Sequence, residues 1–254
     1  MHTKDLGLER GKCMLNKKAL IIGCSGDSES YLPGVEKDVK SIKNFLLSPY
    51  GGYWYEEEII ISLNEGKEDI IEKINSLKEK KLDYVFVVFS GHGDFDIQKN
   101  ERRLWIDDYE FLYESDLLSL SSKQLIIIDS CAGIEEEKKF LLPSMEGLLK
   151  TASLRINYRK IFENYIMECP NQEIILYSSQ KGEYSTDTSK GGLFIQSLLE
   201  VAEENKDYKI LSALKAFELA EEKVILNSKY KQHPDYLVYP KSGKKLPFSL
   251  KVEF

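Results

Sequence analysis

Apolar runs alternate with amphipathic segments along most of the chain. The apolar runs are rich in Ile and Val, which is typical of buried strands, and they cover residues 19–24, 58–63, 84–89, 125–128 and 173–178. Apolar residues at helical spacing predict helices at 35–47, 67–80, 157–168 and 210–226, and a further helix that begins near Gly192. This alternation favours an α/β fold, a three-layer sandwich in which an open, mostly parallel sheet of about six strands lies between helices on both faces.

Shorter elements are expected between and after these segments. The sequence predicts a strand at 103–106 and a short helix at 115–120, and residues 236–239 and 248–252 can supply edge strands. Residues 134–156 carry a run of Glu and Lys with only weak periodicity, which is typical of a mobile or cleavable loop. We expect an N-terminal tail at 1–16 and one domain at 17–254 that contains this loop.

Two of the predicted strands end in motifs that carry reactive side chains. Ser90-Gly91-His92-Gly93 follows the strand at 84–89, and Asp129-Ser130-Cys131-Ala132-Gly133 follows the strand at 125–128. Open parallel sheets place their chemistry at the carboxyl ends of strands, so we expect His92 and Cys131 to meet at one edge. An imidazole promotes ionisation of a thiol, and the thiolate can attack a carbonyl carbon to form a thioester. The backbone N–H groups of Gly93 and Cys131 would then stabilise the oxyanion.

Each motif also has an ordinary structural explanation. A Cys at the end of a strand is commonly a small buried hydrophobic residue, and a Gly-His-Gly sequence can be a simple turn. The placement of both motifs after two similar strands is what favours catalysis by His92 and Cys131.

Charge and cysteine content exclude several classes of function. The chain has 35 basic and 42 acidic residues and a net charge of -7, which argues against a broad nucleic-acid-binding face. Its 4 cysteines form no C-x-x-C pair, which gives no support to a zinc ribbon or a redox motif and fits a reducing compartment. The apolar runs are too short to cross a bilayer, and the N-terminus lacks the apolar segment of a signal peptide. We therefore expect a cytoplasmic protein that binds neither nucleic acid nor membrane.

An ordered series of motifs resembles the caspase-like cysteine peptidases of clan CD, in particular the metacaspases and their prokaryotic relatives. The series extends over about residues 17 to 200 and comprises Ala19-Leu20-Ile21-Ile22-Gly23, Leu32-Pro33-Gly34-Val35-Glu36-Lys37-Asp38-Val39, the two motifs around His92 and Cys131, Gly182-Glu183-Tyr184 and Gly191-Gly192-Leu193-Phe194. The resemblance implies the caspase-like sandwich fold, with Cys131 as nucleophile and His92 as acid and base. It also implies that no cofactor is consumed. The residues around Cys131 differ from those of animal caspases and favour the metacaspase branch.

The resemblance also implies a preference for basic residues before the scissile bond. Asp38 and Asp129 match positions that line the basic-selective pocket of metacaspases, whereas Leu32 stands where caspases that cleave after Asp carry an arginine. Two carboxylates in a partly desolvated pocket suit a guanidinium through charge-assisted hydrogen bonds, so we expect cleavage after Arg in preference to Lys. Asp38 could instead be an exposed helix carboxylate, and Asp129 could cap the following turn.

Two other functions stay open from the sequence. The chain could be a catalytically silent interaction module, or a related peptidase that cleaves after another residue such as Asn. The expected partners of a peptidase are proteins or peptides with exposed basic sites, and an activating protease or regulator. Lys138, Lys139, Arg155 and Arg159 lie in or beside the predicted loop and are candidate processing sites.

Calcium is a further question that the resemblance raises, because several metacaspases need it. Asp107 and Asp108 are weak candidate ligands, but Lys138 stands seven positions after Cys131, where those relatives carry an acid. Calcium requires several oxygen ligands and little positive charge nearby. We therefore expect no metal site and no requirement for a cofactor.

Overall fold

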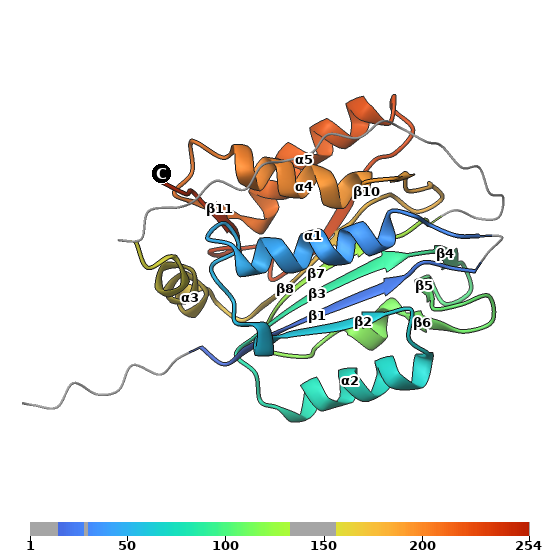
Figure 1. Cartoon of the computed structure of the whole chain (residues 1–254), viewed down its shortest axis with the longest axis horizontal. Coiled ribbons are helices and arrows are strands. Elements are labelled where there is room, and N and C mark those ends of the chain that lie inside the picture. The colour runs from blue at the N-terminus through green and yellow to red at the C-terminus, as the bar shows by residue number, and fades with distance from the viewer. Residues whose placement is uncertain (1–14, 28–29, 133–155, 254) are drawn as a thin grey trace, which may run out of the picture.

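A central sheet lies between two layers of helices in the computed structural model, which describes residues 15–27, 30–132 and 156–253 (Figure 1). Within these residues the sheet has six strands in the order β12-β8-β7-β3-β1-β2. Their bounds are β1 Lys17–Cys24, β2 Ile59–Leu63, β3 Tyr84–Gly91, β7 Lys123–Asp129, β8 Gln172–Tyr177 and β12 Asp235–Tyr239. All neighbours are parallel except β12, which runs antiparallel to β8. The predicted α/β sandwich is confirmed.

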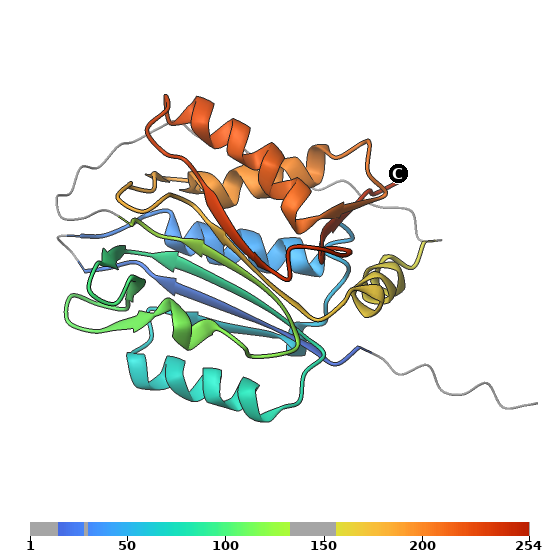
Figure 2. The same cartoon turned by 180° about the vertical axis from the view of Figure 1, so that it is seen from behind.

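The helices divide between the two faces of the sheet. The helices packed against one face are α1 Val35–Leu47, α3 Tyr158–Glu168, α4 Leu193–Glu204 and α5 Ala213–Asn227, and the other face is covered by α2 Lys67–Glu79. The view from behind shows the same division, with the C-terminal helices on one side and α2 on the other (Figure 2). The central strands β1, β3, β7 and β8 therefore have two buried faces, whereas the edge strand β12 is mostly exposed.

Alternate residues of a strand belong to different cores. In β1, Ala19 and Ile21 pack with the layer that contains α1, whereas Leu20 and Ile22 pack with α2. This follows from the two-residue period of side chains along a strand. A strand that is buried on both sides has apolar residues at every position, which explains why the strands are visible in the sequence as continuous apolar runs.

Small sheets surround the main one. The three-stranded sheet formed by β4 Gly93–Asp96, β5 Glu101–Trp105 and β6 Phe111–Tyr113 begins directly after His92. The sequence predicted only its central strand. The predicted short helix at 115–120 is a 3-10 helix, η2, at Glu114–Leu117, and another 3-10 helix, η1, covers Glu56–Glu58.

The C-terminal part departs from the sequence prediction in two places. Residues 210–212 form β11 (Ile210–Ser212), so the predicted helix begins only at Ala213, and Ser212 Oγ accepts a hydrogen bond from the N–H of Lys215 at its start. The predicted edge strand at 248–252 is β13 (Pro247–Leu250), which pairs with β11 and not with the central sheet.

Some predictions lie outside the described residues. These include the loop at 134–156 apart from Ile156, and with it Lys138, Lys139 and Arg155. Among the described residues, no helix is long and apolar enough to span a membrane.

Candidate active site

The register of β3 and β7 brings the two sequence motifs to one edge of the sheet. Ser90 of β3 pairs with Asp129 of β7 in a parallel ladder. His92 and Cys131 each follow two residues later, so they leave neighbouring strands at the same edge. The backbone of Gly93 packs so closely against this segment that a Cβ there would lie 2.7 Å from the carbonyl oxygen of Cys131. The structure therefore places His92, Gly93 and Cys131 together.

The imidazole of His92 is held by backbone groups. Its Nε2 lies within hydrogen-bond distance of the carbonyl oxygen of Ser30, and its own carbonyl accepts a hydrogen bond of 3.1 Å from the N–H of Trp105 in β5. A carbonyl oxygen can only accept, so Nε2 carries the hydrogen of the neutral ring. Nδ1 is then the nitrogen with a lone pair available to receive the thiol proton. Gly26, with a φ of 75°, passes against the ring where a Cβ would lie 3.1 Å from Cδ2.

Cys131 differs from the other cysteines of the described residues. It is half-buried and forms no disulfide, and its Sγ lies 3.7 Å from the carbonyl oxygen of Ser185. Cys24 and Cys169 are buried, and burial raises the pKa of these thiols to about 12 and about 11. They remain protonated at neutral pH, which leaves Cys131 as the half-buried cysteine that follows the strand next to that of His92.

The segment after β8 fixes the backbone around Cys131. Ala132 donates a hydrogen bond of 2.9 Å to Glu183, and Gly182 donates one of 2.8 Å to Ala132. Ser130 is held by the hydroxyl of Ser178, which accepts from its N–H and donates to its carbonyl, both at 3.1 Å. The nucleophile segment therefore depends on residues that follow the next strand of the sheet.

Two buried polar residues that the sequence analysis missed hold that segment in turn. Gln232 is fully buried, and its side-chain amide donates to the carbonyl of Ser178 at 2.8 Å and accepts from the N–H of Thr186 at 2.9 Å. Arg102 of β5 donates to the carbonyl of Ser179 at 2.7 Å and stacks over Tyr177. Neither residue stands near a reactive motif in the sequence, so no local signal could have identified it.

Asp38 is buried beneath the site. Only 1% of its surface is exposed, so the alternative of an exposed helix carboxylate is wrong. It accepts hydrogen bonds from the Ser90 hydroxyl at 2.8 Å, from the N–H of Gly192 at 2.9 Å and from the Gln196 side chain at 3.1 Å. Burial raises the pKa of Asp38 well above its ordinary value, and the nearby carboxylate of Asp129 raises it further.

Asp129 is also buried, and it binds the start of α4. Its carboxylate accepts from the Ser185 hydroxyl at 2.6 Å and from the N–H of Ile195 at 3.2 Å, so it caps a helix and not the turn that follows it. Burial raises its pKa. The approach is close, because a Cβ at Gly192 would overlap Asp129 Oδ2. Asp38 and Asp129 thus lie together at the amino end of α4, where the helix dipole favours negative charge.

A third carboxylate, Asp187, joins this group. It lies in β9 (Asp187–Thr188), which pairs with β10 (Gly191–Gly192), and its Oδ2 accepts a hydrogen bond of 3.2 Å from the N–H of Gly34. Burial raises the pKa of Asp187 to about 6; Asp129 contributes to the rise and His92 opposes it. The sequence analysis did not identify Asp187, because only tertiary structure brings it beside Asp129 and His92.

The other predicted residues lie elsewhere. Asp107 Oδ1 accepts hydrogen bonds of 2.8 Å from the N–H groups of both Tyr109 and Glu110, so it stabilises a turn. The described residues contain no group of three His, Cys, Asp or Glu side chains that could hold a metal ion, so Asp107 and Asp108 do not form a calcium site with their described neighbours.

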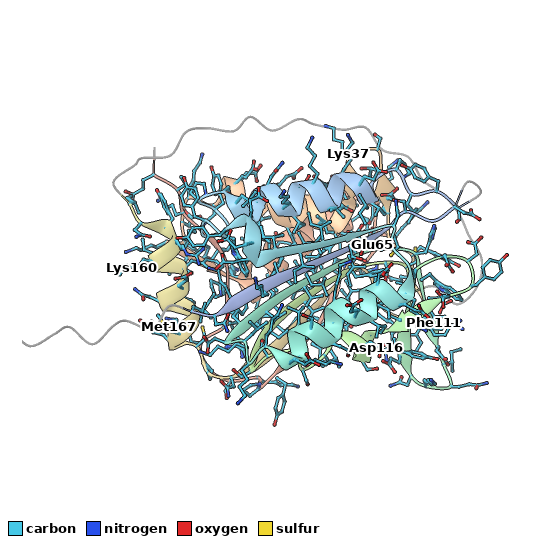
Figure 3. All side chains as sticks on the ribbon, turned by 60° about the horizontal axis from the view of Figure 1, so that its bottom comes forward. Lys37, Glu65, Phe111, Asp116, Lys160 and Met167 are labelled. Carbon is cyan, nitrogen blue, oxygen red and sulfur yellow. The ribbon has the colours of Figure 1, made fainter. Side chains whose placement is uncertain are left out.

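The prediction for Arg159 is corrected by the structure. Arg159 lies in α3 and not in an extended loop, and its guanidinium forms hydrogen bonds of 2.6 and 2.8 Å to the two carboxylate oxygens of Glu58. A peptidase needs an extended backbone at the scissile bond, so this residue does not belong with the processing sites. The helix lies at the opposite end of the sheet from β6, as the labels at Lys160 and Phe111 show (Figure 3).

Comparisons with known proteins agree with this geometry. The family model described as Caspase domain matches residues 16–240. Over 103 residues the chain is 36% identical to Metacaspase-1 of Eremothecium gossypii, an alignment that covers 36% of this chain and 22% of that relative's length. Two crystal structures share the fold. Caspase-1 from Spodoptera frugiperda matches with a TM-score of 0.57 and 17% identity, over 93% of this chain and 94% of that one. A protein from Geobacter sulfurreducens matches with a TM-score of 0.59 and 14% identity, over 92% of this chain and 99% of that one.

Proposed function

Because the chain belongs to the caspase-domain family of cysteine peptidases, we propose that it is an endopeptidase that cleaves proteins after basic residues, with Arg preferred over Lys. The observation that carries the proposal is the pairing of Ser90 with Asp129, which sets His92 and Cys131 on neighbouring strand ends beside buried carboxylates. A catalytically silent module has no need of this arrangement.

The proposed reaction uses a dyad of His92 and Cys131. His92 Nδ1 takes the proton of the Cys131 thiol, and the thiolate attacks the carbonyl carbon of the scissile bond. The backbone N–H groups of Gly93 and Cys131 bind the oxyanion, and each such donor contributes about 2.7–4 kcal/mol in other enzymes. His92 then protonates the leaving amine, and water hydrolyses the thioester to regenerate the thiol. The carbonyl of Ser30 keeps the imidazole in the required tautomer.

The preference for basic residues rests on uncompensated negative charge. Asp38 and Asp129 form no ion pair with a described Lys or Arg, and burial raises the pKa of both. A cationic side chain beside these carboxylates favours their ionised form and supplies the missing counter-charge. Arg is favoured over Lys because its planar guanidinium binds carboxylates with two parallel hydrogen bonds, whereas the ammonium group acts as a point charge.

A panel of fluorogenic peptides that differ only in the residue before the scissile bond tests the proposal. We expect the purified chain to cleave after Arg faster than after Lys, and the Cys131→Ala variant to be inactive. His92→Ala should reduce turnover by about 100- to 10,000-fold, the usual contribution of a general base. Preferred cleavage after Asn or Asp, or unchanged turnover of the Arg peptide by Asp129→Ala, would contradict the proposed specificity.

Activation by cleavage of the loop at 134–156 is part of the same proposal. An enzyme that cleaves after basic residues can process itself after Lys138, Lys139 or Arg155, and another protease of that specificity can do so as well. Intact mass of the wild-type protein and of the Cys131→Ala variant after long incubation separates these cases. Identical masses would exclude self-cleavage.

We also propose that catalysis needs no calcium. Asp107 already accepts two backbone hydrogen bonds, and its described neighbours supply no metal-binding group. Turnover of the Arg peptide should be the same in EDTA as in calcium. A gain of activity on addition of calcium would show that the ligands lie elsewhere.

A further inference from the structure

We propose that Asp187 is the specificity-determining residue that binds the basic side chain of the substrate, while Asp38 and Asp129 mainly hold the start of α4. This inference rests on the proposed function and assigns a direct contact within the same site. The sequence identified Asp38 and Asp129 as the residues that bind the basic side chain. We assign that contact to Asp187, which only the fold brings beside them.

The three carboxylates differ in their access to solvent. Asp38 and Asp129 are only 1% and 5% exposed, whereas Asp187 is half-buried. A guanidinium that approaches from solvent therefore reaches Asp187 first. Contact with either of the other two would require movement of the groups that enclose them.

The hydrogen bonds of the three carboxylates show the same difference. Asp38 accepts from three donors, and Asp129 accepts from a hydroxyl and from the amino end of α4. Asp187 accepts its hydrogen bonds from two backbone N–H groups, that of Gly34 at 3.2 Å and that of Thr188. None of these donors to Asp187 is a charged side chain. Asp187 thus has the greater capacity for a new charge-assisted bond.

The local backbone places Asp187 at the wall of the site. Gly34 directly precedes α1, and the Asp187 carboxylate occupies the position that a Cβ of residue 34 would take. Asp187 is opposite Gly192 in the β9–β10 pair. The N–H of Gly192 donates a hydrogen bond to Asp38, and its α-carbon lies against the carboxylate of Asp129. The carboxylate is therefore fixed between the start of α1 and the two buried carboxylates.

A role for Asp187 in orienting His92 is less consistent with the structure. The Nε2 of His92 is already engaged by the carbonyl of Ser30. The carboxylate of Asp187 is bonded to the N–H of Gly34, and its strand pairs with Gly192, against which Asp129 packs. These contacts associate Asp187 with the other two carboxylates.

The experiment compares the full-length wild type with Asp187→Asn, using as control Asp207→Asn, which removes one negative charge from an exposed loop residue. The substrates are two peptides that differ only in Arg or citrulline before the scissile bond, since citrulline is a neutral isostere of Arg. We expect Asp187→Asn to lower kcat/KM for the Arg peptide by about 10- to 100-fold, mainly through KM, because charge-assisted hydrogen bonds are lost. Cleavage of the citrulline peptide should change less than about 2-fold, since a neutral group loses little.

Two further measurements separate recognition from effects on the dyad or on folding. The rate at which iodoacetamide alkylates Cys131 should be the same in wild type and Asp187→Asn. In the wild type alone, the ratio of kcat/KM for the Arg and citrulline peptides should rise as the pH increases through about 6, because Asp187 must ionise to bind a cation. Taking the ratio cancels any effect of pH on the chemical step, which both peptides share.

The outcomes are distinct. If the wild type cleaves after Arg but Asp187→Asn keeps the same Arg-to-citrulline ratio, the inference is wrong and the proposed function stands. Equal loss on both peptides with slower alkylation of Cys131 would assign Asp187 to positioning of the dyad and would also overturn the inference. A wild type that cleaves neither Arg nor Lys peptides would refute the proposed function and the inference together.

Discussion

Asp38 and Asp129 are buried and Asp187 is half-buried, and none of the three forms an ion pair with a described Lys or Arg. Burial is the main reason why the pKa of each is raised. In the free protein, an ionised carboxylate in this place opposes folding, because it has lost solvation without gaining a counter-charge. On the proposed function, a basic substrate would supply that charge, so stability and recognition would be in conflict at these residues.

Replacement of Asp187 should therefore stabilise the free protein at neutral pH. The folded-state pKa of about 6 lies above the ordinary value of 3.8, so folding favours the protonated form. This contribution is fully present below about pH 4 and is lost as pH rises through about 6. Asp187→Asn keeps an acceptor for Gly34 and should raise the free energy of unfolding at pH 7.5 by about 1–3 kcal/mol, with little change at pH 4.

Urea unfolding of both proteins at pH 4, 6 and 7.5 measures this effect. Asp207→Asn is again the control, because Asp207 is exposed and belongs to none of the ion pairs among the described residues. A stabilisation that is the same at all three pH values would show that the change acts through packing and not through the charge of Asp187.

Short elements position the site as much as the strands do. The β9–β10 pair carries Asp187 and also brings the backbone of Gly192 against Asp38 and Asp129. The φ of Gly192 is -61°, which any residue can adopt, so glycine is required there for space alone. Gly182 is the opposite case, because its φ is 87° while nothing lies within 4 Å of a Cβ.

These two glycines provide a matched pair of substitutions. Gly192→Ala should cost at least about 2 kcal/mol of stability, because the new methyl group overlaps Asp129 and separates α4 from both carboxylates. Gly182→Ala should cost about 1–2 kcal/mol through backbone strain alone. Thermal unfolding and cleavage of the Arg peptide should show that only Gly192→Ala also loses most of its activity. Equal effects on activity would contradict the role of Gly192 at the pocket.

The sequence predicted the long elements well and the short ones poorly, for physical reasons. A helix such as Val35–Leu47 or a strand such as Tyr84–Gly91 is visible because its buried positions recur with a fixed period. The strand Gly93–Asp96 and the two-residue strand at Asp187 pair with neighbours close in sequence, but they are too short to show such a period. The polar residues Gln232 and Arg102 were missed for a different reason, since their partners are backbone carbonyls of a loop far along the chain.

Residues 133–155, which lie outside the described residues, divide the described chain into two parts, yet each of the two cores contains residues from both parts. Strands β7 and β8, which flank that segment, pair in parallel from Lys123 with Gln172 to Ile128 with Tyr177. At the far end of the sheet, the buried ammonium of Lys17 bonds to Glu163 of α3 at 2.6 Å. Asp38 and Asp129 join the parts again at the active-site edge through their bonds to residues 185–196.

These connections predict that cleavage after Lys138, Lys139 or Arg155, by the chain itself or by trypsin, leaves the two fragments associated. The central sheet and both cores span the cut, so separation would expose paired strand edges and apolar surface together. On gel filtration without denaturant, both fragments should elute at the position of the uncut protein, and they should separate only in urea or guanidinium. The cut form of Glu163→Gln should come apart at lower urea, because Lys17 then loses a buried partner. Separate elution of the wild-type fragments in native buffer would mean that the segment between β7 and β8, and not the packing across it, holds the halves together.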